Sequence, residues 1–477
     1  MVGKFLRIPL KKGHGSHAYV SRNTNGTLNF QSRVHKLSIS LRLAPEATPS
    51  NPSKPNLDIQ YLDTILFYGP DGEPTTSLDA DSHGHANYQG FPPLPVATYT
   101  GDGFGGPGEV EQRISIDSEG LALDPRDGGF WVSDEYGPYV YKFDQKGKMQ
   151  LAIQPPEAFL PRRNGTVSFR SGSAFLYAPE DTVNPEDTET GRDNNQGLEA
   201  LTISADGKTL YTMIQSSLDQ EGGPKKQHRQ PVRLLEYDIS GPTPQYKHEY
   251  AVVLPKYRDY TEKSSSKKAY SVAGQSEMHQ LPTGDFLVLA RDSDFGNGME
   301  NTRSVYRHAD VISIHRDSTT DLKGDKYDSA TAAIASSKGD LDSDITPAQY
   351  CSFLDFNVNS ELGRFGMHNG GESGPTALNE KWESLALVPV DPDVQLQLLL
   401  QQQAGDVHGE YFLFSFNDND FMTQDGEYSA FSSGLPKPCR NDLANEVPGH
   451  MNFGKFRYAD QSGLNLDTQA LVFKVSF

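Results

Sequence analysis

Four glutamates stand at the start of four similar segments of the chain. Each one precedes a short alternation of apolar residues, then a turn containing Asp, Gly or Pro, then a second apolar strand that ends in polar residues; they are Glu119, Glu199, Glu277 and Glu383. This pattern predicts a β-hairpin in each segment. If the hairpins are equivalent units of one structure, the four glutamates occupy one register and their side chains meet in one place.

Carboxylates held within a few ångströms raise one another's pKa unless a cation neutralises them. Ligands that are all oxygen atoms favour calcium, with magnesium as the alternative, over zinc or copper. We therefore expect a divalent cation. The ligands that we predict for it are Glu119, Glu199, Glu277, Glu383, Asn417 and Asp418.

The polar ends of the second strands supply groups that could carry out chemistry. Asp134 and Glu135 could accept a proton from water, and Arg291 could hold a phosphate or carboxylate through two parallel hydrogen bonds. We predict Asp134, Glu135, Arg291 and Asp292 as catalytic residues. Local turn formation is the competing explanation for any single Asp, but Glu is not a favoured turn residue, which favours a site for the four glutamates.

The spacing of the glutamates indicates repetition of a unit larger than a hairpin. They recur at intervals of 80, 78 and 106 residues, about twice the 40–50 residues of one propeller blade. Further strands are expected after the hairpins, at 139–149, 232–240 and 304–316. The repetition predicts an all-β fold, a β-propeller with six or seven blades; a pair of β-sandwiches is the alternative.

The bulk composition narrows the class of partner. The 477 residues carry a net charge of −20, which disfavours binding to nucleic acid or to anionic membranes, and no stretch is long enough for a membrane span. We expect a monomer that acts on a small molecule. Cys351 and Cys439 allow at most one disulfide, and Asn25 and Asn164 stand in glycosylation tripeptides.

Four stretches together resemble the phytase-like family, which is described as having esterase-like activity. They are SEGLALDPRDGGFWVSDEYG, QGLEALTISADGKTLYTMIQSSL, QSEMHQLPTGDFLVLARDSDFG, and KWESLALVP with FNDNDF. The resemblance implies a propeller domain with long surface loops over residues 32–477, after an irregular segment at 1–31. It also implies an exported protein, although the first residues lack the apolar core of a signal peptide.

The resemblance further implies that the first blade is incomplete. Family members generally open with a Gly-rich hairpin before the segment that resembles residues 32–45, and none precedes it here. We therefore expect an open seam in the first blade, which the last strand, at 469–477, would close.

The predicted function is metal-assisted hydrolysis of a phosphoester or a related ester by a phytase-like or esterase-like enzyme. Two alternatives stay open. One is a noncatalytic propeller that calcium stabilises and that binds a ligand or partner, and the other is a lactonase-type propeller hydrolase.

Overall fold

The computed structural model describes residues 27–175, 177–391, 409–418, 426–429, 455–458 and 468–477. Over these residues the fold is all-β, as expected, and consists of several small antiparallel sheets, none of which closes into a barrel. None of the helices found there is long and apolar enough to cross a membrane.

Three sheets contain four strands each, in the order of the chain. Their strands are β6 (Ser118–Leu123), β7 (Phe130–Asp134), β8 (Val140–Phe143) and β9 (Met149–Ile153); β12 (Leu198–Ile203), β13 (Thr209–Ile214), β14 (Pro231–Asp238) and β15 (Gln245–Val253); and β18 (Gly274–Gln280), β19 (Phe286–Arg291), β20 (Arg307–Ser313) and β21 (Gln349–Asp355). The first two strands of each sheet are a predicted hairpin, and β8, β14 and β20 are the further strands that the sequence predicted.

The other sheets are smaller. Their strands are β1 (Arg33–Leu41) with β2 (Leu57–Leu66); β3 (His85–Ala86), β4 (Leu94–Thr100) and β5 (Val110–Ile114); β22 (Ala386–Pro389), β23 (Glu410–Phe416) and β26 (Ala470–Ser476); and the pairs β10 (Arg162–Arg163) with β11 (Thr166–Val167), β16 (Lys256–Arg258) with β17 (Tyr270–Val272), and β24 (Gly426–Ser429) with β25 (Lys455–Tyr458). The helices α1 (Asp325–Asp328) and α2 (Asn359–Leu362) are single turns between strands.

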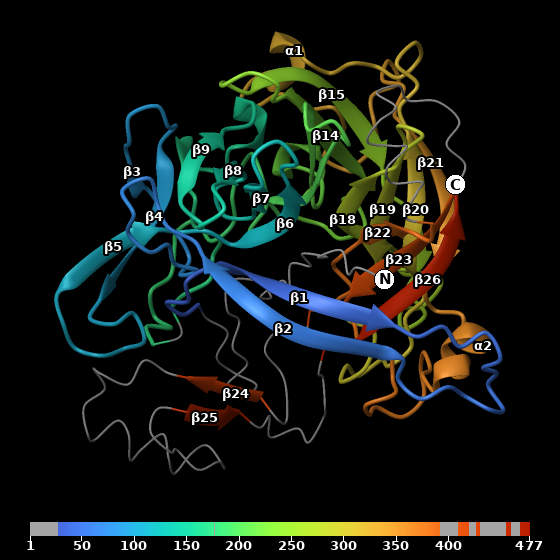
Figure 1. Cartoon of the computed structure of the whole chain (residues 1–477). Coiled ribbons are helices and arrows are strands. Elements are labelled where there is room, and N and C mark those ends of the chain that lie inside the picture. Colours follow the sequence, from blue (N-terminus) through green and yellow to red (C-terminus); the bar gives the residue numbers. More distant parts are fainter. Residues whose placement is uncertain (1–26, 176, 392–408, 419–425, 430–454, 459–467) are drawn as a thin grey trace.

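The first strands of the four-stranded sheets are neighbours at the centre of the molecule. Strand β12 contacts β6 on one side and β18 on the other. Figure 1 shows β6, β7, β8 and β9 following one another from the centre to the rim. A single apolar cluster joins the facing surfaces of these sheets, with Trp131, Leu201 and Val288 among its fully buried members. The arrangement brings the polar ends of the hairpins toward one central region.

The last strand does not close the first sheet, which corrects the expectation for residues 469–477. Strand β26 pairs with β23 over its whole length, from Ala470 opposite Phe416 to Ser476 opposite Glu410. The β1–β2 ribbon packs its Ile39 and Leu57 against the same sheet through side-chain contacts.

The sequence features on the surface are placed as follows. Asn164 is exposed at the tip of the β10–β11 hairpin, whereas Asn25 lies outside the described residues. Cys351 is exposed on β21, and Cys439 also lies outside the described residues.

A buried ion group anchors the long loop at 317–348 to the sheet of β12 to β15. Arg233 on β14 is fully buried and donates hydrogen bonds to Glu221 Oε1 and Glu249 Oε1, both at 2.9 Å. It also donates to Tyr327 O, and Glu221 accepts from Ile334 N, so the loop is held by both charges. Burial opposes the charged form of Arg233, but the two carboxylates outweigh it and raise its pKa.

We expect Arg233→Met to lower the free energy of unfolding by about 3–5 kcal/mol, because it leaves two buried carboxylates without their cation. Urea denaturation of the full chain measures this. Arg316→Met is the matched control: Arg316 pairs with Glu236 at 2.7 Å but is half exposed, so its loss should cost less than about 1 kcal/mol. Equal effects of the two substitutions would contradict the assignment.

Candidate active site

Three buried carboxylates meet at the ends of β6 and β7. Asp117, Glu119 and Glu135 each offer an oxygen atom, and the three atoms lie within 4.8 Å of one another. All three side chains are at most 3% exposed. Among the described residues this is the one group of three or more potential metal ligands. Three oxygen donors at this separation suit a hard divalent cation such as calcium.

The backbone brings the three carboxylates together. The amide of Glu135 donates to Asp117 O at 3.0 Å, which joins the end of β7 to the residue before β6. Two glycines let the neighbouring strand β12 come close. A Cβ atom at Gly197 would lie 2.3 Å from Glu135 O, and one at Gly120 would lie 2.7 Å from Glu199 O. Side chains at these two positions would push the sheets apart.

Asp134, predicted as catalytic, is the last residue of β7 and is surrounded by donors. Its Oδ1 accepts from Asp117 N and Tyr136 N, and its Oδ2 accepts from Gly137 N and from the hydroxyl of Tyr141. The distances run from 2.8 to 3.1 Å. Burial raises the pKa of Asp134 to about 6, while these hydrogen bonds favour the charged form. The side chain therefore positions the backbone of Asp117 and Glu135.

Asp292 and Asn417 have the same structural role in other sheets. The amides of Asp134, Asp292 and Asn417 each donate to the carbonyl at the start of the following strand, on Tyr139, Tyr306 and Gln469 respectively. Asp292 accepts from Ser304 Oγ, Val305 N and Tyr306 N, and burial raises its pKa. Asn417 Oδ1 accepts from Gln469 N at 2.5 Å.

Glu119, Glu199 and Glu383 keep the predicted common register. In each case the backbone carbonyl two residues before the glutamate accepts a hydrogen bond from the backbone amide of a residue that follows the second strand of the hairpin. The acceptor and donor residues are Asp117 and Glu135, Gly197 and Gln215, and Lys381 and Asp418. These hydrogen bonds make Glu135, Gln215 and Asp418 equivalent positions. Glu199 and Glu383 are buried but do not join the group of three carboxylates.

Glu277 is out of that register, which corrects the prediction. The bulge of β12 falls between Leu198 and Ala200, at Glu199, whereas the bulge of β18 falls between Gln275 and Glu277. Ser276 therefore takes the position of the other glutamates. Glu277 Oε1 accepts from Met278 N at 2.8 Å and from Leu201 N at 3.3 Å, so this side chain faces the neighbouring strand.

Basic side chains occupy the other half of the centre. Arg291 Nη2 donates to Glu383 Oε1 at 2.5 Å, and Lys381 Nζ lies 3.1 Å from Asp418 Oδ2. Burial lowers the pKa of Arg291, but Glu383 and the more distant Glu380 and Glu199 outweigh it and raise the pKa. Arg291 therefore stays cationic, as its predicted role requires.

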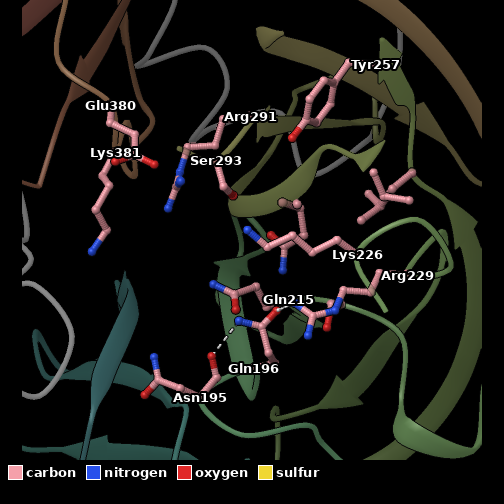
Figure 2. A pocket seen from close by; sticks show the side chains of 15 residues that line it. Asn195, Gln196, Gln215, Lys226, Arg229, Tyr257, Arg291, Ser293, Glu380 and Lys381 are labelled. Atoms are coloured by element: carbon pink, nitrogen blue, oxygen red, sulfur yellow. Dashed lines mark hydrogen bonds between the residues drawn. The ribbon is translucent and has the colours of Figure 1, made fainter. Parts of the chain in front are cut away.

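A cavity of about 280 Å³ lies beside these two ion pairs, and Arg291 and Lys381 are part of its wall. Figure 2 shows side chains from separate parts of the chain gathered around it. Of the described residues that line it, four are basic and one is acidic; they are Lys226, Arg229, Arg291, Lys381 and Glu380. Each of the four basic side chains also pairs with a carboxylate: Lys226 with Asp294, Arg229 with Asp193, Arg291 with Glu383 and Lys381 with Asp418.

Two further acidic residues, Asp193 and Asp219, lie close to each other, and Asp193 contacts the cavity wall through Arg229. Arg229 pairs with Asp193 and donates to Gln196 Oε1 at 3.0 Å. Asp219 accepts from the hydroxyl of Thr188 close by. Burial, with a contribution from the charge of Asp193, raises the pKa of Asp219 to about 7.

Sequence reasoning missed three kinds of residue at this site. Asp117 stands two positions before Glu119, and the period of two along a strand places both side chains on one face, which was the available signal. Fully buried Arg192 donates to Tyr136 O and Phe169 O and so holds the loop after Glu135. Of the basic residues of the cavity wall, Arg291 was predicted, whereas Lys226 and Arg229 come from a loop outside the repeated segments.

Comparisons with known proteins give the following likenesses. Residues 29–400 match the family described as "Phytase-like: Esterase-like activity of phytase". A protein of Arthroderma benhamiae, named an uncharacterized secreted protein, is 58% identical over 408 residues, which are 86% of this chain and 78% of that protein. A Bacteroides uniformis structure, provisionally described as a 6-phosphogluconolactonase, is 11% identical with a TM-score of 0.24. The match covers 62% of this chain and 65% of that one, slightly less than two thirds of its length, and it is too distant to carry an argument.

We expect Asp134→Asn and Glu135→Gln to have different effects. The amide nitrogen that Asp134→Asn introduces cannot accept the hydrogen bonds from Gly137 N and the Tyr141 hydroxyl, so this change should lower the free energy of unfolding by about 2 kcal/mol or more. Glu135→Gln should instead weaken calcium binding and change the stability of the calcium-free protein little. Urea denaturation with chelator and calcium titration calorimetry separate the two. A calcium affinity that both variants retain would contradict the positions assigned to them.

We expect Asp219 to make stability fall as pH rises from about 4 to about 7. Its folded-state pKa, about 7, lies above the ordinary value of an aspartate, so the folded state binds the extra proton in this window and loses stability when the proton leaves. Asp219→Asn should flatten this part of the profile, with a difference on the order of 1 kcal/mol per pH unit relative to the wild-type chain. Urea denaturation at pH 4, 5, 6 and 7 checks it, and parallel profiles for the two proteins would refute it.

Proposed function

We propose that this chain, which belongs to the phytase-like family, is a metal-assisted hydrolase of phosphoesters or related esters. The observation that carries the proposal is the group of Asp117, Glu119 and Glu135, whose oxygen atoms lie within 4.8 Å of one another in a buried position. A divalent cation bound there would neutralise the three carboxylates and would polarise an oxygen atom of the ester. Calcium fits the all-oxygen donors best, with magnesium as the alternative.

Arg291 is the group that we assign to the anionic part of the substrate. It lines the cavity, and it is already held in place by its hydrogen bond to Glu383. A guanidinium fixed in this way can present its remaining N–H groups to a phosphate or a carboxylate without losing much side-chain entropy.

Glu199 is the group that we assign to proton transfer from the attacking water. It occupies the register of Glu119 on the adjacent strand β12, and its charge contributes to the raised pKa of Arg291. A buried carboxylate beside a cation site can accept a proton from a water molecule that lies between them. Asp134, one of the two residues that the sequence predicted for this step together with Glu135, has four donors around its carboxylate and serves to position its neighbours.

The proposal includes the architecture and the location of the protein. The five sheets that begin at β3, β6, β12, β18 and β22, together with the β1–β2 ribbon, support a propeller of six blades. An extracellular location is supported by the secreted description of the Arthroderma benhamiae relative and by the exposed Asn164 in its glycosylation tripeptide.

We expect Glu119→Gln to lower calcium affinity and turnover together, by at least tenfold each, because it removes a charged ligand. Glu199→Gln should keep the calcium affinity and lower kcat by about 100-fold, as loss of a general base does. Calcium titration calorimetry and release of nitrophenol from its phosphate monoester and carboxylate esters measure both. Glu109→Gln, on an exposed carboxylate, is the control and should leave both quantities unchanged.

The same assays separate the alternatives. Turnover that persists at full rate in chelator would refute the role of a cation. Calcium-dependent melting without turnover of any phosphoester, carboxylate ester or lactone would identify a noncatalytic binding protein. Faster turnover of lactones than of phosphoesters would place the chain among lactone hydrolases.

A further inference from the structure

We infer that the 280 Å³ cavity between β13 and β19 binds the non-reacting part of the substrate, and that this part is a small anion that carries free hydroxyl groups. The inference rests on the proposed function in one respect only, namely that the ligand of the cavity is the substrate of the adjacent carboxylates. It adds the chemical class of that substrate, which neither the carboxylates nor Arg291 define.

The basic groups of the lining favour an anion. Four basic residues and one acidic residue line the described part of the cavity wall. Arg229, Arg291 and Lys381 pair with the mostly buried carboxylates of Asp193, Glu383 and Asp418. Lys226 instead pairs with Asp294 across 2.6 Å at the surface, where both side chains are more than half exposed. Such an exposed pair contributes little free energy, so Lys226 can exchange Asp294 for an anionic ligand at small cost.

The hydrogen-bonding groups of the lining favour a ligand that donates hydrogen bonds, as hydroxyl groups do. Within the described part of the chain, the Oε1 atoms of Gln215 and Gln275 and the Oγ atom of Ser216 have no hydrogen-bond partner, and their side chains are 7%, 1% and 3% exposed. Gln275 is oriented by its amide nitrogen, which donates to Met213 O at 3.1 Å, so its Oε1 can only accept. A buried acceptor without a donor costs about 1–3 kcal/mol. A fully ionised phosphate has no proton to donate, whereas a hydroxyl group has one.

The size and position of the cavity fit a single small ring. Its volume is near the lower end of the range for ligand sites and suits a group of the size of one small ring. Gln215 occupies the position on its sheet that Glu135 occupies on the neighbouring sheet, since their amides donate to Gly197 O and Asp117 O in the same way. A ligand seated in the cavity therefore extends toward the carboxylates at the same ends of the strands.

Binding of ribose 5-phosphate to the full chain in the presence of chelator tests the inference. Calorimetry should give an affinity at least tenfold tighter for ribose 5-phosphate than for inorganic phosphate or for ribose. Gln215→Met keeps the length of the side chain and removes the acceptor, so it should weaken ribose 5-phosphate about tenfold and leave phosphate unchanged. Lys226→Met should weaken both anions. Lys263→Met, on an exposed lysine that does not line the cavity, is the matched control.

The outcomes are distinct. Phosphate that binds as tightly as ribose 5-phosphate would overturn the requirement for hydroxyls. If Gln215→Met fails to fold by circular dichroism, Ser216→Ala takes its place, and an unchanged affinity in the folded variant would likewise overturn it. Because no cation and no turnover are involved, a chain that binds the sugar phosphate but hydrolyses nothing fails only the proposed function. A chain that hydrolyses aryl phosphates without preferring the sugar phosphate fails only this inference.

Discussion

Mutual repulsion of buried carboxylates is the constraint around which the centre of the molecule is organised. Two unit charges 4.8 Å apart repel by about 3 kcal/mol at the effective dielectric constant of protein sites, and Asp117, Glu119 and Glu135 form three such pairs. Backbone amides hold them in place, and buried Arg192 donates to the carbonyl of Tyr136 next to Glu135. The centre thus has an acidic part and a separate part rich in basic side chains, the division that the proposed hydrolysis of an ester with an anionic substituent would use.

Backbone contacts, more than side-chain packing, fix the spacing of the acidic half. Gly120 and Gly197 allow β6 and β12 to approach within a distance that no side chain would tolerate. Asp134 holds the amides of both Asp117 and Tyr136 on one oxygen atom. Asp292 and Asn417 hold the following strand in other sheets in the same way. One backbone geometry therefore recurs, while the chemical type of the neighbouring side chains differs from sheet to sheet.

The sequence predicted the hairpins well because apolar alternation and turn residues are local signals. For the same reason it placed Glu119 among the expected metal ligands and Glu135 among the expected catalytic residues, and the structure brings the two side chains together. It misplaced Glu277, since the glutamates were aligned by residue type, whereas the structure aligns the apolar Met278 with Leu201. It could not distinguish a turn-forming Asp134 from a catalytic one, because the difference lies in four donors that come together only on folding. The cavity joins strand ends and loops that are distant in the chain, and of its basic residues only Arg291 was predicted from the repeated hairpins.

The segregation of charge has a consequence for how an anion reaches the cavity. At low ionic strength the net charge of −20 repels anions from every direction, and the few basic side chains of the cavity act only at short range. Salt at about 0.1 M screens electrostatic interactions beyond about 10 Å. It therefore removes the long-range repulsion of anions by the net negative charge before it removes their short-range attraction to the basic side chains of the cavity. Encounter with the anionic substrate proposed above would therefore be favoured at higher salt concentration, the reverse of the usual behaviour of a basic site on a neutral protein.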